Sequence, residues 1–250
     1  MRENWVVAPE FKELNKQLRQ AVAQFDQTGE LIVAGDRNTI RKVEINGSWY
    51  SIKRFKIPNA FQSLVYRFLR KSKAQRSYLY GMKLLAADLG TPTPVAYLEQ
   101  FGLGLKQSFY ISRHLDYDLD FRVLIHKPLY PDRKKILRQF TKFTYDLHQQ
   151  GIQFLDHSPG NTLIVKVGED YHFYLIDLNR MRFGTMNLEN RMRNFRRLWL
   201  SKAMIKVMAP VYAELYGEST DHIHELMLRY SGQFQKKITA KKVRRRRRRS

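Results

Sequence analysis

Residues 147–161 read LHQQGIQFLDHSPGN, and this stretch decides how the rest of the chain is interpreted. It begins as the end of a helix and passes into a loop, because a Pro-Gly pair lies between Asp156 and Asn161. The loop therefore holds a carboxylate and an amide at a fixed separation. Taken alone, the pattern also fits a solvated turn, so the remaining sequence must decide between a turn and a functional site.

The composition is that of a large chain without cysteine. Its 250 residues, 43% of them hydrophobic, suffice for one large domain or a two-lobed one. No apolar run approaches the ~18–20 residues of a membrane-spanning helix, and the first residues lack the apolar core of a signal peptide. The absence of cysteine excludes disulfides and thiolate metal sites. We therefore expect a cytoplasmic protein.

The formal net charge of +22 is extreme for this length. Ten of the positive charges lie in residues 236–250, which we expect to form a disordered basic tail because they carry few apolar side chains and repel one another. Without that tail the chain still carries about +12. Such a charge favours a polyanion as partner, which could be nucleic acid, an anionic membrane or a phosphorylated substrate.

Hydrophobic spacing predicts a strand-rich first part and a mainly helical second part. Asn46-Gly47, between two β-rich runs, predicts a hairpin, and residues 131–150 predict an amphipathic helix that begins at a proline. The predicted fold class is α+β. The predicted organisation is an N-terminal helical segment (1–29), a strand-rich N-lobe (30–112), a C-lobe with the 147–161 loop (113–235) and the basic tail (236–250).

Four polar side chains lie where predicted elements begin or end. Lys53 lies in a strand, Asp156 and Asn161 lie in the loop, and Asp177 follows the apolar run FYLI. This combination suits phosphoryl transfer, because a lysine can pair with phosphate oxygens and an Asp with an Asn can hold Mg²⁺, which prefers oxygen ligands. The second Asp can accept the proton of the acceptor hydroxyl.

The order and spacing of these motifs resemble the protein kinase-like superfamily and, within it, the lipopolysaccharide core kinases of heptose and Kdo. LHQQGIQFLDHSPGN resembles the kinase catalytic loop, YSIKRF the strand of the nucleotide-binding lysine, and LIDLNRMRFG the metal-binding segment. The resemblance covers roughly residues 30–200 and implies a two-lobed kinase-like fold. It also implies a catalytic Asp156, ATP binding by Lys53, and Mg²⁺ binding by Asn161 and Asp177.

The chain departs from the kinase pattern at several positions. Phe154 and Leu155 stand where kinases have His-Arg before the catalytic Asp, and Ser158 stands where a Lys is common. Gly35 is the one glycine left in the VAGDRNT stretch that takes the place of the glycine-rich loop. The helix glutamate that pairs with the lysine is also missing, since the corresponding triplet begins at Arg76 and reads RSY.

The resemblance implies an ATP-dependent sugar kinase that acts on the lipopolysaccharide inner core at the cytoplasmic face of the inner membrane. The basic charge fits a substrate that is an anionic, lipid-linked glycan at an anionic membrane surface. Two alternatives remain open: a catalytically impaired kinase-like scaffold, motivated by the missing glutamate, and a protein kinase. A nucleic-acid ligand is not expected, since the sequence contains no nucleic-acid-binding motif.

Overall fold

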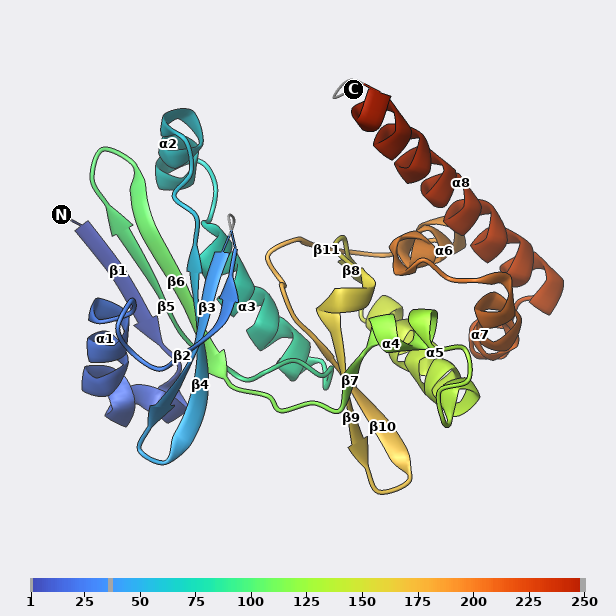
Figure 1. Cartoon of the computed structure of the whole chain (residues 1–250), viewed down its shortest axis with the longest axis horizontal. Coiled ribbons are helices and arrows are strands. Elements are labelled where there is room, and N and C mark those ends of the chain that lie inside the picture. Colours follow the sequence, from blue (N-terminus) through green and yellow to red (C-terminus); the bar gives the residue numbers. More distant parts are fainter. Residues whose placement is uncertain (1, 36–37, 248–250) are drawn as a thin grey trace. The chain divides into compact units, whose positions relative to one another are not determined.

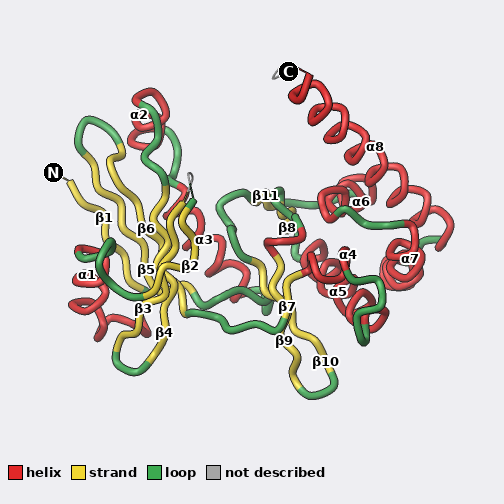
Figure 2. Tube along the Cα trace, viewed as in Figure 1, coloured by secondary structure: helices red, strands yellow, loops and turns green. Residues whose placement is uncertain are grey.

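A computed structural model of the chain describes residues 2–35 and 38–247. The chain divides into two compact units, Met1–Asp116 and Tyr117–Ser250. Strands dominate the first unit and helices the second (Figures 1 and 2). The boundary lies four residues beyond the expected end of the strand-rich lobe, and residues 2–29 belong to the first unit rather than to a separate segment.

The first unit is built on one antiparallel sheet of six strands in the order β1-β5-β6-β4-β3-β2. The short 3-10 helix η1 supplies Phe11, helix α1 supplies Leu18 and Val22, and Phe25 just after α1 joins them in the hydrophobic core of this unit. Helix α3 packs against β5 and β6. The elements are β1 (Arg2–Val7), η1 (Pro9–Leu14), α1 (Asn15–Ala23), β2 (Glu30–Ala34), β3 (Asn38–Ile45), β4 (Ser48–Phe55), α2 (Ala60–Phe68), α3 (Lys73–Ala86), β5 (Pro94–Phe101) and β6 (Leu105–Arg113).

Strands β3 and β4 confirm the hairpin predicted at Asn46-Gly47. Ile45 pairs with Ser48, and both turn residues have positive φ, 50° at Asn46 and 71° at Gly47, as the favoured two-residue hairpin turn requires. Strand β1 was not expected from the sequence. It pairs with β5 from Arg2↔Phe101 to Val7↔Ala96 and forms one edge of the sheet.

The second unit packs its helices around one hydrophobic core and carries two small sheets, β10-β9-β7 and β11-β8. Helix α5 packs against α7, and α7 packs against α8. The elements are β7 (Leu119–Asp120), α4 (Phe121–His126), α5 (Arg133–Gln149), β8 (Ile152–Phe154), η2 (Pro159–Asn161), β9 (Thr162–Val167), β10 (Asp170–Leu175), β11 (Met181–Phe183), α6 (Leu188–Phe195), η3 (Arg196–Leu198), α7 (Lys202–Tyr216) and α8 (Thr220–Arg247).

The basic tail differs from its predicted disorder, because residues 236–247 continue helix α8 and residues 248–250 lie outside the described part (Figure 1). In this part of the helix the Lys242 ammonium lies 5.9 Å from the Trp199 ring, and Phe234, just before it, meets Trp199 edge-on at 6.0 Å between ring centroids. Lys, Arg and Ala also favour a helix once it has begun. Within the described residues, no helix is both long and apolar enough to cross a bilayer.

Candidate active site

The 147–161 stretch forms the last turn of α5, strand β8 and the loop that leads into β9. Strand β8 pairs with β11 through Phe154↔Met181, and the Leu155 amide donates to the Arg180 carbonyl at 3.0 Å. These bonds hold the chain just before Asp156 against the chain that follows Asp177. Two predicted site residues that are 21 positions apart in the sequence are therefore carried by neighbouring segments.

Asn161 joins the same region through its backbone and its side chain. Its Nδ2 donates to the Asp156 carbonyl at 2.9 Å, and its own carbonyl accepts from the Ile176 amide at 3.0 Å. The next residue, Asp177, has φ of +59°, a left-handed conformation that Asp adopts more readily than most residues. The second unit therefore brings together Asp156, Asn161 and Asp177, three of the four side chains singled out from the sequence.

Asn161 and Asp177 fit the donor set of a hard divalent cation. Because the Asn161 amide nitrogen is engaged by the Asp156 carbonyl, the amide oxygen is the atom that remains for a ligand. Asp177 Oδ1 accepts from Asn179 Nδ2 at 2.8 Å, and a carboxylate has about four lone-pair sites, so such a bond still allows coordination. Oxygen ligands of this kind suit Mg²⁺, which keeps several waters and binds few protein groups.

Two arginines that the sequence had not marked as site residues contact the Asp156 carboxylate. Arg180 Nη1 lies 3.2 Å and Arg197 Nη1 3.3 Å from Asp156 Oδ1. The Asp156 side chain is 15% exposed, whereas Arg180 is 53% exposed. The carboxylate is thus oriented from one side by cations that also face solvent, which makes this part of the site attractive to anions.

The loop rests on an aromatic cluster that explains one departure from the kinase pattern. Phe154 is fully buried, and its ring centroid lies 5.8 Å from that of His157, which also neighbours Phe140 at 5.5 Å and Phe195 at 6.4 Å. Neither ring nitrogen of His157 has a hydrogen-bond partner, and burial, followed by the nearby His148, lowers its pKa to about 3. His157 is therefore a neutral core residue, and the buried Phe154 ring packs close to it.

A buried network of polar side chains binds the last residue of β8. Asn194 Nδ2 donates to the Phe154 carbonyl at 2.7 Å, so its Oδ1 accepts from His148 Nε2 at 3.1 Å. His148 Nδ1 in turn accepts from the Tyr212 hydroxyl at 2.9 Å. Burial lowers the pKa of His148 to about 3, which keeps this ring neutral and fixes the direction of the chain of bonds. The network therefore connects His148 of α5 to the segment that precedes Asp156.

Lys53 lies in the first unit, on the central strand β4, where it pairs with Ile40 and Tyr110. Its ammonium lies 5.2 Å from the centroid of the Phe55 ring. Its approach to the three residues of the second unit stays a prediction. Helix α3 has no carboxylate in its sequence, and Ser77, at the position of the usual glutamate, donates its hydroxyl to the Lys73 carbonyl at 2.9 Å.

The stretch in the place of the glycine-rich loop connects β2 to β3. Gly35 precedes residues 36–37, which lie outside the described residues. Of the described residues, no group of three or more His, Asp or Glu side chains is arranged to hold a metal ion. Any metal at this site would therefore depend on the Asn161 and Asp177 oxygens together with the ligands that a substrate brings.

A six-stranded antiparallel unit, a helical unit and the loop that carries Asp156 and Asn161 define a protein with the two-lobed protein kinase-like fold. Residues 40–230 match the family model described as "Lipopolysaccharide kinase (Kdo/WaaP) family", and the chain belongs to this family of kinases. The expected fold class and family are thereby confirmed.

Among solved structures, the chain is similar to "WaaP in complex with acyl carrier protein". The two sequences are 18% identical, the match covers 96% of this chain and 98% of that chain, and the TM-score is 0.64. At this identity the likeness shows the fold. A comparison with curated proteins finds no match.

Proposed function

We propose that the chain is an ATP-dependent kinase that phosphorylates a sugar hydroxyl of the lipopolysaccharide inner core, on a heptose or on Kdo. The observation that carries this proposal is the joint placement of Asp156, Asn161 and Asp177 by the β8–β11 and β9–β10 pairings. Family membership supports the substrate class. A fold alone would support neither the reaction nor the acceptor.

Each side chain has a role that follows from its chemistry and its surroundings. Asp156 orients the acceptor hydroxyl and accepts its proton as the oxygen attacks the γ-phosphorus of ATP. Asn161 and Asp177 would hold Mg²⁺, which when bound neutralises charge on the phosphate oxygens. Lys53 pairs with phosphate oxygens of the nucleotide. No carboxylate on α3 orients this lysine, so its positioning differs from that in protein kinases.

The two arginines on Asp156 restrict how an acceptor approaches. Both contact the same oxygen, Oδ1, so the acceptor hydroxyl reaches the base through the other oxygen of the carboxylate. An acidic group on the acceptor would then find Arg180 and Arg197 beside the reacting hydroxyl. This arrangement favours an anionic glycan over a neutral sugar, because charge-assisted hydrogen bonds to arginine are the strong ones.

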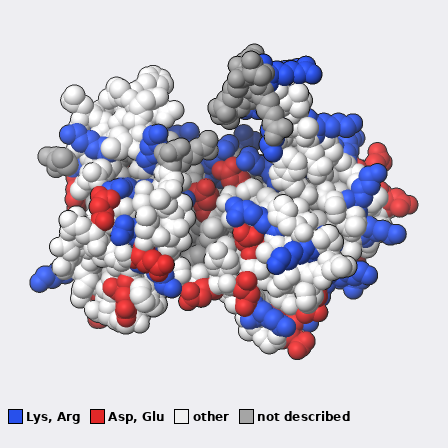
Figure 3. Space-filling view, in the orientation of Figure 1, with Lys and Arg blue, Asp and Glu red and all other residues white. Residues whose placement is uncertain are grey.

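The proposed substrate is lipid-linked, so the proposed location is the cytoplasmic face of the inner membrane, where ATP is available. Lys236, Lys237, Lys241 and Lys242 are exposed on α8, and Figure 3 shows Lys and Arg side chains along the exposed side of this helix. Basic side chains at an anionic membrane surface contribute about 1 kcal/mol each. Helix α8 is therefore a proposed electrostatic contact with the membrane.

The test is transfer of labelled γ-phosphate from ATP, with Mg²⁺, to purified core lipopolysaccharide that lacks inner-core phosphate. We expect wild type to label the glycan. Asp156→Ala should label nothing detectable while it binds ATP nearly as well as wild type, because the base contacts the acceptor and not the nucleotide. Asp146→Ala removes a carboxylate from the α5 surface of the same unit and should transfer phosphate normally. Equal loss of ATP binding in Asp156→Ala would contradict the assigned role.

The missing carboxylate on α3 keeps a second candidate function, a non-catalytic kinase-like scaffold. That function predicts bound ATP and no transfer to any acceptor by a normally folded wild-type chain. Label in an added protein but not in the glycan would instead indicate a protein kinase. An acyl carrier protein is a candidate protein partner, since the similar solved structure contains one.

A further inference from the structure

Helix α2 of the first unit turns its apolar face outward. None of its residues is buried. The exposed fractions are 77% for Phe61, 46% for Leu64 and 69% for Phe68. These positions are spaced by three and four residues and therefore share one face of the helix. The apolar stripe continues into the residues that flank the helix, with Ile57 at 60% and Leu69 at 83% exposure.

The opposite, polar face attaches α2 to the unit. Ser63 Oγ donates to the Leu105 carbonyl at 2.8 Å, and Arg67 donates to the Gly102 carbonyl. Gly104 permits this close approach, because a Cβ there would lie 2.3 Å from Ser63 Oγ and 3.0 Å from the Ser63 carbonyl carbon. A surface helix of a globular protein normally packs its apolar face on the core. Here hydrogen bonds fix the reverse orientation.

The surroundings of α2 are strongly basic. Residues 56–73 contain five Lys or Arg side chains and no Asp or Glu. Within the described parts of the chain, Arg70 and Lys71 form no salt bridge, and both are exposed. The pKa of Arg76 is lowered by its burial and then by the charge of Arg70, which agrees with an excess of positive charge here.

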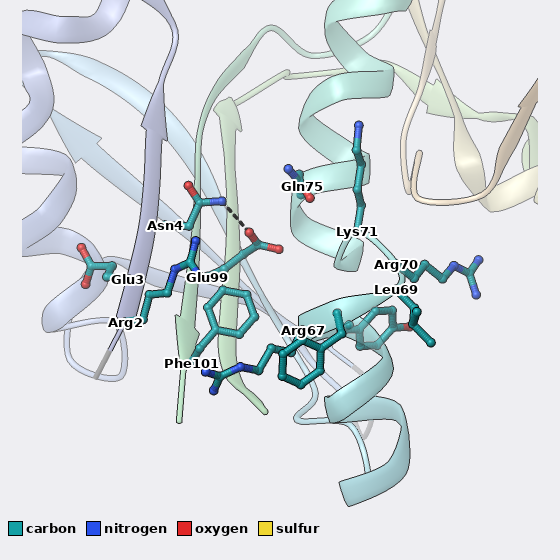
Figure 4. Close-up of a pocket in the computed structure, with 12 residues that line it drawn as sticks. Arg2, Glu3, Asn4, Arg67, Leu69, Arg70, Lys71, Gln75, Glu99 and Phe101 are labelled. Atoms are coloured by element: carbon teal, nitrogen blue, oxygen red, sulfur yellow. Dashed lines mark hydrogen bonds between the residues drawn. The ribbon is translucent and has the colours of Figure 1, made fainter. Parts of the chain in front are cut away.

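A cavity of about 460 Å³ adjoins the C-terminal end of α2 (Figure 4). Arg2, Arg67, Arg70 and Lys71 line it with their cationic side chains. One of its carboxylates, Glu99, is buried and accepts from Asn4 Nδ2 at 2.7 Å. The cavity therefore places several guanidinium and ammonium groups beside the exposed apolar stripe, where they could bind phosphate oxygens.

We propose that α2 and its flanking residues, 57–71, form a docking surface for an anionic phospholipid bilayer. The apolar side chains enter the boundary between headgroups and acyl chains, and Arg70 and Lys71 bind lipid phosphates. An outward apolar stripe flanked by cations is the pattern of helices that lie in the plane of a membrane interface. Apolar side chains that project from the surface can insert into a fluid bilayer. Arg70 and Lys71, which form no salt bridge within the described residues, would favour anionic lipids.

This inference goes beyond the proposed function, because it concerns lipid binding by the first unit and needs neither ATP nor the residues of the second unit. It also differs from the proposed contact of α8, since it includes apolar insertion. Binding through α8 alone would be lost when salt screens the charges. Binding through α2 should retain an apolar component that salt does not remove.

The experiment is flotation of the full chain with vesicles of phosphatidylcholine, with or without phosphatidylglycerol. We expect binding to the mixed vesicles and little to phosphatidylcholine alone. The double variant Phe61→Ser, Phe68→Ser should lower the partition coefficient by about a hundredfold, on the order of tenfold for each inserted aromatic side chain. The pair Arg70→Gln, Lys71→Gln should lower it by roughly twentyfold or more, from about fivefold per cation.

Matched variants in the second unit separate this surface from a general effect of charge or hydrophobicity. Leu129→Ser removes a leucine that is 96% exposed, and Lys134→Gln with Arg138→Gln removes two exposed cations of α5. Leu129→Ser should leave vesicle binding unchanged, and the Lys134, Arg138 variant should lower it by no more than the general loss of charge predicts. Equal losses in the α2 variants and the controls would overturn the proposal.

Two further outcomes are decisive. If the α2 variants bind vesicles as wild type does but lose binding to purified acyl carrier protein, α2 is a protein-docking surface and the lipid proposal is wrong. Phosphorylation of deacylated core glycan, which needs no membrane, should be unchanged in the α2 variants. A chain that binds vesicles through α2 but phosphorylates no glycan would therefore refute the proposed function and leave this inference standing.

Discussion

Helices α2 and α5 are both amphipathic, yet they use their apolar faces in opposite ways. In α5, the side chains of Ile136, Leu137 and Phe140 are fully buried in the core of the second unit. Helix α2 has no buried residue, and its two phenylalanines are among the more exposed side chains of the protein. Helical periodicity therefore identifies a helix and its apolar face. It does not tell whether that face packs against the protein core or remains on the surface.

The largest expected effect concerns stability. Phe140→Ala should lower the free energy of unfolding by about 3–5 kcal/mol, because it removes a buried ring and leaves a cavity. Phe68→Ala should change it by no more than about 0.5 kcal/mol, since that ring is largely in water already. Urea denaturation of both variants measures the difference. Equal losses would mean that α2 is packed after all.

The pH dependence of the free energy of unfolding should show an effect of intermediate size, which comes from two buried histidines of the second unit. His148 of α5 and the neighbouring His157 have native-state pKa values of about 3, against about 6.5 when unfolded. Their contribution to stability is complete above pH 6.5 and declines as the pH falls below it, because the unfolded chain then binds protons that the native state excludes. The slope from each histidine is about 1.4 kcal/mol per pH unit.

His157→Leu is the matched variant for this titration. The ring makes no hydrogen bond through either nitrogen, so leucine should not destabilise the protein at pH 7 and should remove about half of the acid-dependent slope. Circular dichroism during urea unfolding between pH 7 and pH 5 provides the measurement. An unchanged slope in the variant would show that His157 titrates in water.

The smallest effect concerns the polar attachment of α2. Ser63→Ala removes the hydrogen bond to the Leu105 carbonyl and should lower the free energy of unfolding by about 0.5–1.5 kcal/mol, the net contribution of an ordinary hydrogen bond. Hydrogen exchange of the α2 amides should increase more than that of the α5 amides, because few other contacts hold α2. Unaltered exchange in α2 would mean that other contacts fix its orientation.

Several features were predictable because they depend on neighbouring residues. The Asn46-Gly47 hairpin follows from the preference of these two residues for positive φ, and α5 follows from its apolar spacing. The loop with Asp156 and Asn161 was recognisable because the two residues are five positions apart around a Pro-Gly pair, and in the structure they do interact directly. Asp177 was placed by its position after an apolar strand.

Other features depend on residues far apart in the sequence and could not be read from local pattern. Arg197 reaches Asp156 across 41 positions, and Asn194 reaches the Phe154 carbonyl across 40. Strand β1 exists because it finds the edge of β5. Trp199 contacts α8 at Phe234 and at Lys242, and composition alone could not anticipate these contacts.

The sequence by itself determined the hairpin, the amphipathic helices, the loop that carries Asp156 and Asn161, and the resemblance to the lipopolysaccharide kinases, because periodicity, turn preference and motif spacing are properties of neighbouring residues. The tertiary structure alone decided which cations surround Asp156, why Phe154 can stand before it, and that α2 faces outward. These outcomes depend on contacts between distant segments. Burial and hydrogen-bond partners are set by where the whole chain places a residue, not by its neighbours in sequence.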